Sequence, residues 1–297
     1  MDPIAKTAYY CCGVRAADAR SANAVCGDNL AERFMDTEAQ AVFRPFANLK
    51  EANASNAARH RIIDDLLRER LRVQPDLPVV LVGAGFDTRA FRLGGGRWLE
   101  LDHPSVVALK DAKLPAAQSP NPLQRASIDF ASERLADKLA AWAGTPSAVV
   151  VMEGVSMYLN PEQLRATTHT LRQLLPRHTL LCDLINATFV RRYSKRLRQA
   201  IRDLGGEFAV PLDDPAALVE SLGYRRFAAH SVVGRAVEHG SLRLPRWLLS
   251  TLLCSLRDGY GVYAFEAQPM SEPSSGVAVG EALLSSATDR KLAEFQG

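Results

Sequence analysis

The first regular pattern in the chain is an amphipathic stretch at residues 52–71. Apolar side chains recur there every three or four residues with charged ones opposite, which predicts a helix with one buried face. The apolar stripe consists of Ile62, Ile63, Leu66, Leu67 and Leu71. Pro75 and Pro78 interrupt the pattern. A continuous apolar run at 79–82 follows, and it is typical of a strand that is buried on both faces.

From residue 79 onward, strand patterns and helix patterns alternate. We expect strands at residues 79–82, 98–101, 125–128, 148–152, 178–184, 226–231 and 261–266. Helices are expected from residue 104, at 133–142, from 161 with Asn160 as N-cap, at 216–222 and at 247–256. The alternation predicts an α/β fold with a mostly parallel seven-stranded sheet and right-handed crossovers.

The composition is that of an ordinary globular protein. The chain of 297 residues is 47% hydrophobic and 23% charged, and its net charge of +3 is spread along the sequence. Without a clustered basic face we expect no nucleic-acid partner. The five cysteines form no CxxC pair, so we expect reduced thiols and no metal site.

No segment resembles a membrane span or a leader sequence. The N-terminus has no apolar run of the kind found in signal peptides. The most apolar stretch, at 242–256, is interrupted by Arg243, Pro245 and Arg246 and is too short to cross a bilayer. We therefore expect a cytoplasmic protein with no membrane partner.

The clearest chemical signal is a glycine turn directly after the strand at 79–82. Gly83 and Gly85 allow backbone to approach a ligand there, and Asp87 follows in the turn. A dinucleotide fingerprint requires a third glycine where this chain has Thr88. The alternative is that these glycines serve the geometry of the turn alone.

Carboxylates end the next strands. Asp102 follows the strand at 98–101, where a carboxylate accepts hydrogen bonds from both hydroxyls of a nucleoside ribose. Asp129 stands in the same position after the third strand, where an adenine would lie. For both residues the alternative is a helix cap.

The fourth strand ends at Glu153. A carboxylate that leaves an apolar strand needs a cationic partner, either on a ligand or on one of the many arginines. Met157 and Tyr158 follow closely, and we favour packing over pocket lining for them. His60 and His103 lie near these motifs and are interpreted as structural.

Together these motifs resemble the leucine carboxyl methyltransferases and their bacterial O-methyltransferase relatives. The resemblance covers roughly residues 5–185 and rests on segments that keep the order and spacing of the family. These segments are Thr7-Ala8, Arg15-Ala16, Ala58-Arg59, Asp64-Asp65, 83–89, 100–104, Asp129-Phe130 and 153–159. One departure is Val155-Ser156, where relatives often carry two bulky aliphatic residues.

The resemblance implies a class I methyltransferase fold with S-adenosyl-L-methionine as cofactor. It implies that Arg59 holds the methionine carboxylate and that Glu153 binds the methionine end. Gly83 would form the cofactor turn, with Gly85 and Asp87, and Asp102 would hold the ribose. Asp129 and Phe130 would hold the adenine.

We interpret residues 1–297 as one methyltransferase domain. Its expected parts are an N-terminal helical lid (1–75), a cofactor-binding core (76–184), a helical insertion (185–212), the completion of the sheet (213–268) and a fraying tail (269–297). Within the insertion, residues 191–204 are expected to form one solvated helix.

The expected reaction is O-methylation of a small-molecule or peptide acceptor, with a carboxylate favoured. Acceptor-site candidates are Tyr10, Arg15, Arg61 and Tyr158, although Arg15 and Arg61 would equally suit a solvated helix face. A carboxylate arrives ionised and needs no general base, and no obvious base is present. The alternatives are a hydroxyl acceptor, an NAD(P)-dependent oxidoreductase and a nucleoside-binding protein without activity.

Overall fold

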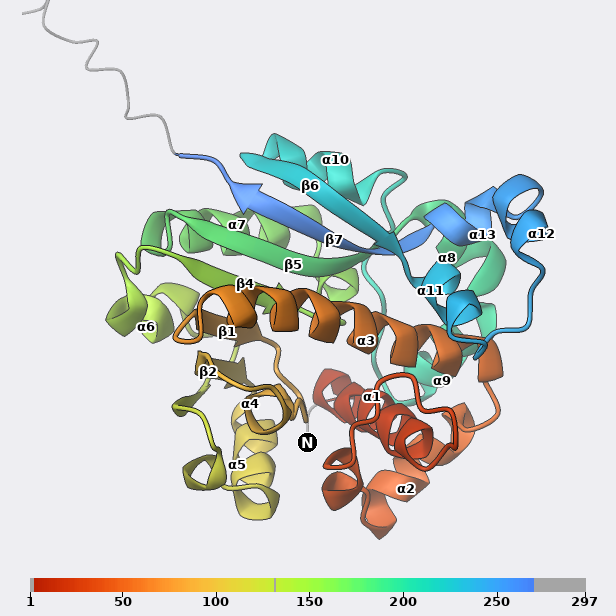
Figure 1. The fold of residues 1–297 in the computed structure, drawn as a ribbon, viewed down its shortest axis with the longest axis horizontal. Helices are drawn as coiled ribbons and strands as arrows, with labels where there is room; N and C mark the ends of the chain where they lie inside the picture. Colours follow the sequence, from red (N-terminus) through yellow and green to blue (C-terminus); the bar gives the residue numbers. More distant parts are fainter. Residues whose placement is uncertain (1–2, 131, 270–297) are drawn as a thin grey trace, which may run out of the picture.

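Seven strands form one sheet in the computed structural model, which describes residues 3–130 and 132–269. The order across the sheet is β3-β2-β1-β4-β5-β7-β6, and only β7 runs antiparallel to its neighbours (Figure 1). The strands are β1 (Pro78–Val82), β2 (Arg97–Asp102), β3 (Leu123–Ser127), β4 (Ala148–Met152), β5 (His178–Ile185), β6 (Tyr224–Ser231) and β7 (Tyr260–Ala267). The strand order reverses between β1 and β4, which is the point where open α/β sheets bind ligands.

Helices cover both faces of the sheet because the central strands are apolar on both faces. Val79 and Leu81 of β1 pack on one side, and Val80 and Val82 pack on the other. The first side is covered by α3 (Lys50–Val73) and α11 (Val232–Glu238). The second is covered by α6 (Leu135–Leu139), η4 (Ala140–Trp142), α7 (Pro161–Leu174) and α10 (Pro215–Ser221). Asn160 caps α7 in a capping box with Gln163, as the sequence predicts for the N-cap.

Short helices connect the strands and surround the carboxyl ends of β1 and β4. Between β1 and β3 lie α4 (Arg89–Arg92), α5 (Pro104–Lys113) and η3 (Ala116–Gln118), and η5 (Ser156–Tyr158) follows β4. The N-terminal part consists of α1 (Pro3–Ala19), η1 (Ala31–Phe34), α2 (Thr37–Phe43) and η2 (Arg44–Phe46). The ring of Tyr9 on α1 packs on Phe86 of the glycine turn, with centroids 4.9 Å apart. The N-terminal helices therefore lie directly over the turn after β1.

Two helix predictions were wrong. The stretch 191–204 is not one solvated helix but parts of α8 (Ala187–Tyr193) and α9 (Lys195–Asp203). Ser194 separates them, since its hydroxyl donates back to the Val190 carbonyl (2.7 Å). The buried Ile201 also shows that α9 has an apolar face.

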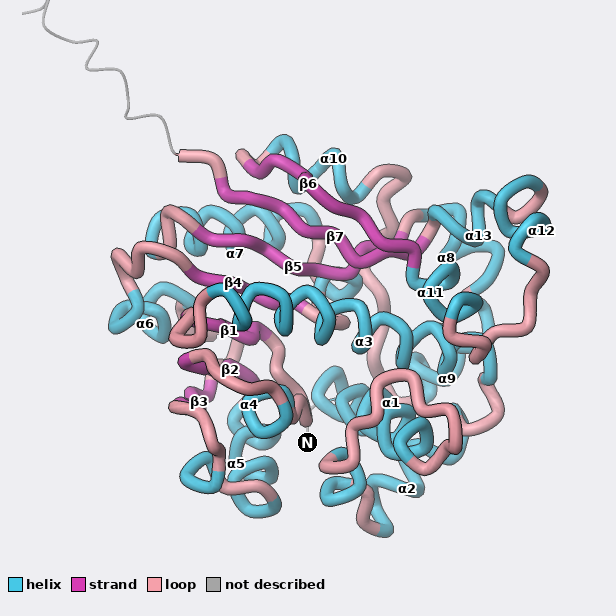
Figure 2. The backbone as a smooth tube through the Cα atoms, in the orientation of Figure 1, coloured by secondary structure: helices cyan, strands magenta, loops and turns pink. Residues whose placement is uncertain are grey.

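The apolar stretch 247–256 likewise divides into α12 (Arg246–Thr251) and α13 (Cys254–Asp258). The N–H groups of Leu252 and Leu253 both bond to the Leu248 carbonyl, which closes the first helix. Figure 2 shows α12 and α13 as separate helices. Most of the expected tail, residues 270–297, lies outside the described residues. None of the helices in 3–130 and 132–269 combines the length and hydropathy needed to cross a bilayer.

Candidate functional site

The turn after β1 requires glycine at two positions. Gly83 and Gly85 have φ values of +71° and +49°, a conformation that L side chains rarely adopt. A Cβ on Gly83 would also stand 2.5 Å from Cγ2 of Val155, so the turn packs against the loop after β4. The N–H groups of Gly83 and Ala84 donate to the Leu101 carbonyl of β2. The loops of three central strands are thus held together at one edge of the sheet.

Asp102 ties the glycine turn to the end of β2. Its Oδ2 accepts from the Gly85 N–H (2.6 Å), and its Oδ1 accepts from the His103 N–H (2.7 Å). Burial raises the pKa of this carboxyl above its usual range, against the effect of the two N–H donors. The N-cap of α5 is His103, whose Nδ1 accepts from the Ser105 N–H, so the alternative of Asp102 as that cap is wrong.

Asp129 and Phe130 follow β3 at the same edge. Asp129 accepts from the Ser132 hydroxyl (2.7 Å), and its N–H donates to Glu133 (2.8 Å). It does not cap α6, whose N-cap is Arg134. The Phe130 ring is 48% exposed, which is unusual for a phenylalanine at the edge of a core.

Glu153, at the end of β4, is bound by two arginines. Arg59 of α3 donates from Nε to Oε1 (3.0 Å), and Arg89 of α4 donates from Nη1 to Oε2 (2.7 Å). Burial would raise the pKa of Glu153, but Arg89, His60 and Arg59 together hold it well below its usual range. Arg59 also donates to Asp183 (3.1 Å) at the end of β5 and to the Tyr260 hydroxyl (3.0 Å).

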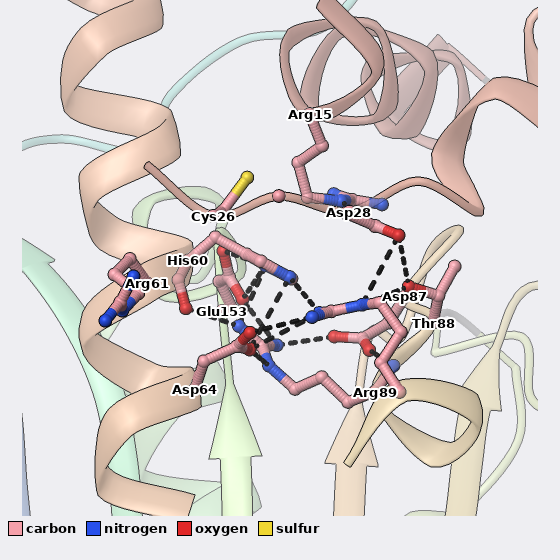
Figure 3. Close-up of polar contacts among 12 residues, drawn as sticks. Arg15, Cys26, Asp28, His60, Arg61, Asp64, Asp87, Thr88, Arg89 and Glu153 are labelled. Atoms are coloured by element: carbon pink, nitrogen blue, oxygen red, sulfur yellow. Dashed lines mark hydrogen bonds and ion pairs between the residues drawn. The ribbon is translucent and has the colours of Figure 1, made fainter. Parts of the chain in front are cut away.

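Arg89 is the centre of this buried network (Figure 3). It is fully buried and binds Asp64, Asp87 and Glu153, which come from α3, the glycine turn and β4. The Asp87 carboxylate therefore points at Arg89. Its Oδ1 also accepts a hydrogen bond from the Arg89 backbone N–H (2.7 Å). Ligand atoms of His60, Asp87 and Glu153 lie within 4.8 Å of one another, close enough to hold a metal ion. The Arg89 guanidinium already supplies the positive charge between them.

His60 has a structural place in the network, in agreement with its interpretation from sequence. Its Nδ1 lies 3.2 Å from Glu153, and its Nε2 lies 2.8 Å from a guanidinium nitrogen of Arg92. Burial and the charge of Arg89 lower the pKa of His60, so the imidazole is neutral. Nδ1 also lies 2.8 Å from Nη2 of Arg89, so each ring nitrogen faces a guanidinium donor.

The four acceptor-site candidates divide into two pairs. Arg15 is buried, and its Nε donates to Asp28 (2.9 Å) while its Nη2 donates to the Phe86 carbonyl (2.7 Å). It therefore does not lie on a solvated helix face. Arg61 pairs with Asp65 (2.7 Å) on the outer side of α3. Neither arginine lines the large cavity described next, whereas Tyr10 and Tyr158 do. Met157 lines it too, and Tyr158 also packs edge-on against Phe208 (5.5 Å), so Tyr158 both packs, as favoured from sequence, and lines the cavity.

This cavity of about 950 Å³ adjoins the Arg59–Glu153 pair. Its buried end is formed by Tyr10, Arg59, Gly154, Tyr158 and Tyr260. Its apolar wall is formed by Leu197, Ile201, Phe208, Val233 and Leu256. The exposed residues at its mouth include the charged Lys50, Glu51, Arg192 and Arg243. The cavity therefore leads from a cationic rim along apolar walls to a cluster of phenols.

Sequence reasoning missed Arg89, Asp183 and Tyr260. Arg89 stands in the segment 83–89 that carries the resemblance, and its position two residues after Asp87 was the available signal. Asp183 lies inside a strand pattern and Tyr260 just before another. Their contacts with Arg59 span 124 and 201 residues, so no local pattern reveals them.

Residues 8–172 match the sequence profile of the leucine carboxyl methyltransferase family. The tetracenomycin polyketide synthesis O-methyltransferase of Streptomyces glaucescens is 25% identical over 219 residues, which cover 72% of this chain and 77% of that one. A protein of Parafrankia sp. (strain EAN1pec), described as an S-adenosyl-L-methionine-dependent methyltransferase, is 28% identical over 54% of this chain and 56% of its own length.

Among solved structures, a DUF574 family protein from Streptomyces avermitilis shares the fold. It has a TM-score of 0.53 at 12% identity and covers 87% of this chain and 97% of its own. The family profile spans more than half of the chain and includes the glycine turn, Asp102, Asp129 and Glu153. The chain belongs to the leucine carboxyl methyltransferase family and is an S-adenosylmethionine-dependent methyltransferase.

Proposed function

We propose that the protein methylates a carboxylate oxygen of a bulky, mostly apolar small molecule. The observation that carries this proposal is the cavity of about 950 Å³ that ends at Arg59 and Gly154. Its size lies at the upper end of the range of small-molecule sites, about 300–1,000 Å³. A cavity of this size with apolar walls suits a compact ring system better than a peptide chain.

The cofactor side of the proposal uses Arg59 of α3 and the residues that follow β1 to β4. The latter are Gly83, Gly85, Asp87, Asp102, Asp129, Phe130 and Glu153. Their chemistry fits S-adenosylmethionine. Arg59 and Glu153 carry the two charges that complement an amino-acid zwitterion. Asp102 has lone pairs beyond those used by Gly85 and His103, and they can accept from ribose hydroxyls. The exposed ring of Phe130 offers an apolar face for an adenine.

Asp87 has an indirect role in this proposal. Its carboxylate fixes Arg89, and Arg89 in turn orients Glu153. When bound, S-adenosylmethionine supplies an electrophilic methyl group on a sulfonium sulfur. The chain's own contribution is to align the acceptor oxygen and to keep water out of the buried end of the cavity.

The lack of a base near the buried end supports a carboxylate acceptor. Among the described residues that line it, Tyr10, Tyr158 and Tyr260 are neutral phenols, because burial raises the pKa of each well above its usual value near 10. Tyr260 already donates its proton to Asp183 (2.9 Å), whereas Tyr10 and Tyr158 can donate hydrogen bonds to an anion. None of the three takes a proton at neutral pH. A carboxylate is already ionised, and the rim residues Lys50, Arg192 and Arg243 would attract it.

The relative from Streptomyces glaucescens supports the expected substrate class. Its name places it in polyketide synthesis as an O-methyltransferase. A polycyclic acid of that bulk would match the apolar wall of the cavity.

The test uses three matched probes with labelled S-adenosylmethionine: anthracene-2-carboxylic acid, 2-hydroxyanthracene and a short peptide that ends in leucine. We expect label in the acid, as an ester that mild alkali hydrolyses. Tyr10→Phe should raise KM for the acid, because it removes a donor, while Tyr263→Phe on β7, outside the cavity lining, serves as the control. Label in the hydroxy compound or the peptide, with none in the acid, would overturn the proposal.

A further inference from the structure

Two short segments beside the cavity mouth contain an unusual concentration of positive charge, which differs from the even spread of charge, and from the absence of a membrane partner, expected in the sequence analysis. Residues 184–202 and 239–257 together contain nine arginines and lysines and none of the chain's 33 acidic residues. The nine are Arg191, Arg192, Lys195, Arg196, Arg198, Arg202, Arg243, Arg246 and Arg257. Within residues 3–130 and 132–269, only Arg257 of this set is in an ion pair, with Asp258. Since the whole chain has a net charge of only +3, the rest of the molecule is net negative.

The same place exposes large apolar side chains. On α12 and just after it, Trp247 is 65% exposed and Leu252 is 74% exposed. Of the three tryptophans, the other two, Trp98 and Trp142, are buried at 1% and 9%. An exposed Trp–Leu pair flanked by arginines is the pattern of a surface that lies in the interface of a bilayer.

The two segments pack together at the mouth of the cavity. Tyr193 at the end of α8 lies 3.0 Å from the Ser255 hydroxyl of α13, through their side-chain oxygens. Arg192 and Tyr193 line the cavity from one segment, and Arg243 lines it from the other, three residues before α12. In Figure 1, α12 lies at the right-hand edge of the molecule, which is also the side where α3 begins. The cationic rim therefore borders the opening, and the apolar pair lies outside it on the segment that carries Arg243.

We infer that this mouth surface, formed by Arg192, Tyr193, Arg243, Arg246, Trp247 and Leu252, docks on an anionic lipid bilayer. The arginines pair with lipid phosphates, while Trp247 and Leu252 enter the headgroup region. A bilayer fits better than a nucleic acid, because exposed tryptophan and leucine gain nothing from a phosphate backbone. The docked mouth gives a lipophilic acceptor a path into the cavity that avoids water. That path rests on the proposed function, whereas docking itself does not.

The test measures binding of the full chain to vesicles of phosphatidylcholine alone and of phosphatidylcholine with phosphatidylglycerol in equal parts. We expect sedimentation only with the anionic vesicles, and a blue shift of tryptophan emission that comes from Trp247. Arg243→Ser combined with Arg246→Ser should weaken binding about twenty-five-fold, since each arginine contributes about fivefold near an anionic surface. Trp247→Ser with Leu252→Ser should weaken it about tenfold or more and remove the blue shift.

A matched control lies at the other end of α3, about 35 Å along that helix from the rim residue Lys50. There Val73 is 75% exposed beside the exposed Arg72, so Arg72→Ser with Val73→Ser makes the same kind of change away from the mouth. This control should bind vesicles as the unmodified chain does. Trp247 and Leu252 do not line the cavity, so their double variant should still methylate a soluble probe acid. Loss of vesicle binding with methylation intact thus separates this inference from the proposed function.

Four results would overturn the inference. They are no binding to the anionic vesicles, equal binding by the Trp247/Leu252 variant, a concentration-dependent blue shift without lipid that accompanies a dimer mass, and binding of a duplex oligonucleotide instead of vesicles. The third result would assign the surface to a second copy of the chain, and the fourth to a nucleic acid.

Discussion

Arg89 donates a hydrogen bond from Nη1 to Oε2 of Glu153 across 2.7 Å, and both side chains are largely enclosed by the fold. Through this contact, the segment after β1 fixes the carboxylate at the end of β4. The same guanidinium also binds Asp64 and Asp87, so one side chain neutralises carboxylates from three parts of the sequence. The arrangement explains why a strand that is otherwise apolar can end in an ionised residue.

Removal of Arg89 should therefore destabilise the fold strongly. Arg89→Met leaves Asp64, Asp87 and Glu153 without their shared cation, and we expect a loss of about 3–5 kcal/mol in the free energy of unfolding. Urea denaturation followed by circular dichroism measures this loss. Arg68→Met is the control, since Arg68 also binds Asp64 (3.3 Å) but is 46% exposed, and its loss should cost about 1 kcal/mol or less. Equal effects of the two substitutions would contradict the central role of Arg89.

Asp102→Ala should weaken binding of S-adenosylhomocysteine by about 1.5–3 kcal/mol, because charge-assisted hydrogen bonds to the ribose are lost. It should also cost about 1–3 kcal/mol in stability, because the Gly85 and His103 N–H groups lose their acceptor. Titration calorimetry on the folded variant measures the first effect. Asp214→Ala provides the control: it removes the α10 cap on Ala217 (2.9 Å), at a cost of about 1 kcal/mol, and should bind normally. Normal binding by folded Asp102→Ala would make Asp102 purely structural.

The strands of the core could be predicted from sequence because their pattern is local. The expected strand at 148–152 coincides with β4, and the run at 79–82 differs from β1 by one residue. The helices after β5 were harder, because Ser194 and Leu252 end helices that the apolar periodicity alone would continue. The short helices α4 and α11 were not anticipated.

The site was only partly predictable, for a similar reason. Carboxylates at strand ends are visible in sequence. The segment 83–89 has Thr88 where a dinucleotide fingerprint has its third glycine, which argues against an NAD(P)-dependent oxidoreductase. Membership in the methyltransferase family removes that alternative. The partners of those carboxylates come from distant segments, as with Arg59, which joins Glu153, Asp183 and Tyr260. Membership in a transferase family also removes the alternative of a nucleoside-binding protein without activity.

His178 should lower the free energy of unfolding as the pH is reduced from about 6.5 to 4. Burial lowers its pKa to about 4, while the unfolded histidine titrates near 6.5. The neutral ring lies 2.6 Å from the Leu175 carbonyl and 3.0 Å from the Tyr224 hydroxyl. Its contribution is therefore complete above about pH 6.5 and is lost as the pH falls toward the folded pKa, because the unfolded chain takes up a proton that the folded chain does not.

At pH 5 this loss should amount to about 2 kcal/mol relative to pH 7. Urea unfolding at the two pH values measures it, and His178→Gln should lack this component. His169→Gln, a change at an exposed position of α7, should keep the pH dependence of the unmodified chain. The same loss in His178→Gln would assign the acid sensitivity to other groups.

The acceptor chemistry proposed above should be visible in the pH dependence of kcat/KM. A carboxylate with a pKa near 4 is ionised throughout the range from about pH 6 to 9, so the rate should be nearly flat there. The lining phenols contribute no step, because the pKa values of Tyr10, Tyr158 and Tyr260 are all raised by burial. Glu153 contributes none either, since its pKa is held well below its usual range.

A hydroxyl acceptor with a pKa near 10 would instead require a base, and the rate would climb roughly tenfold per pH unit until that base was ionised. Initial rates with anthracene-2-carboxylic acid over this range distinguish the two cases, with the alkali lability of the product as an independent check. A steep climb with an alkali-stable product would assign the methyl group to a hydroxyl and would require a base that enters the cavity with the acceptor.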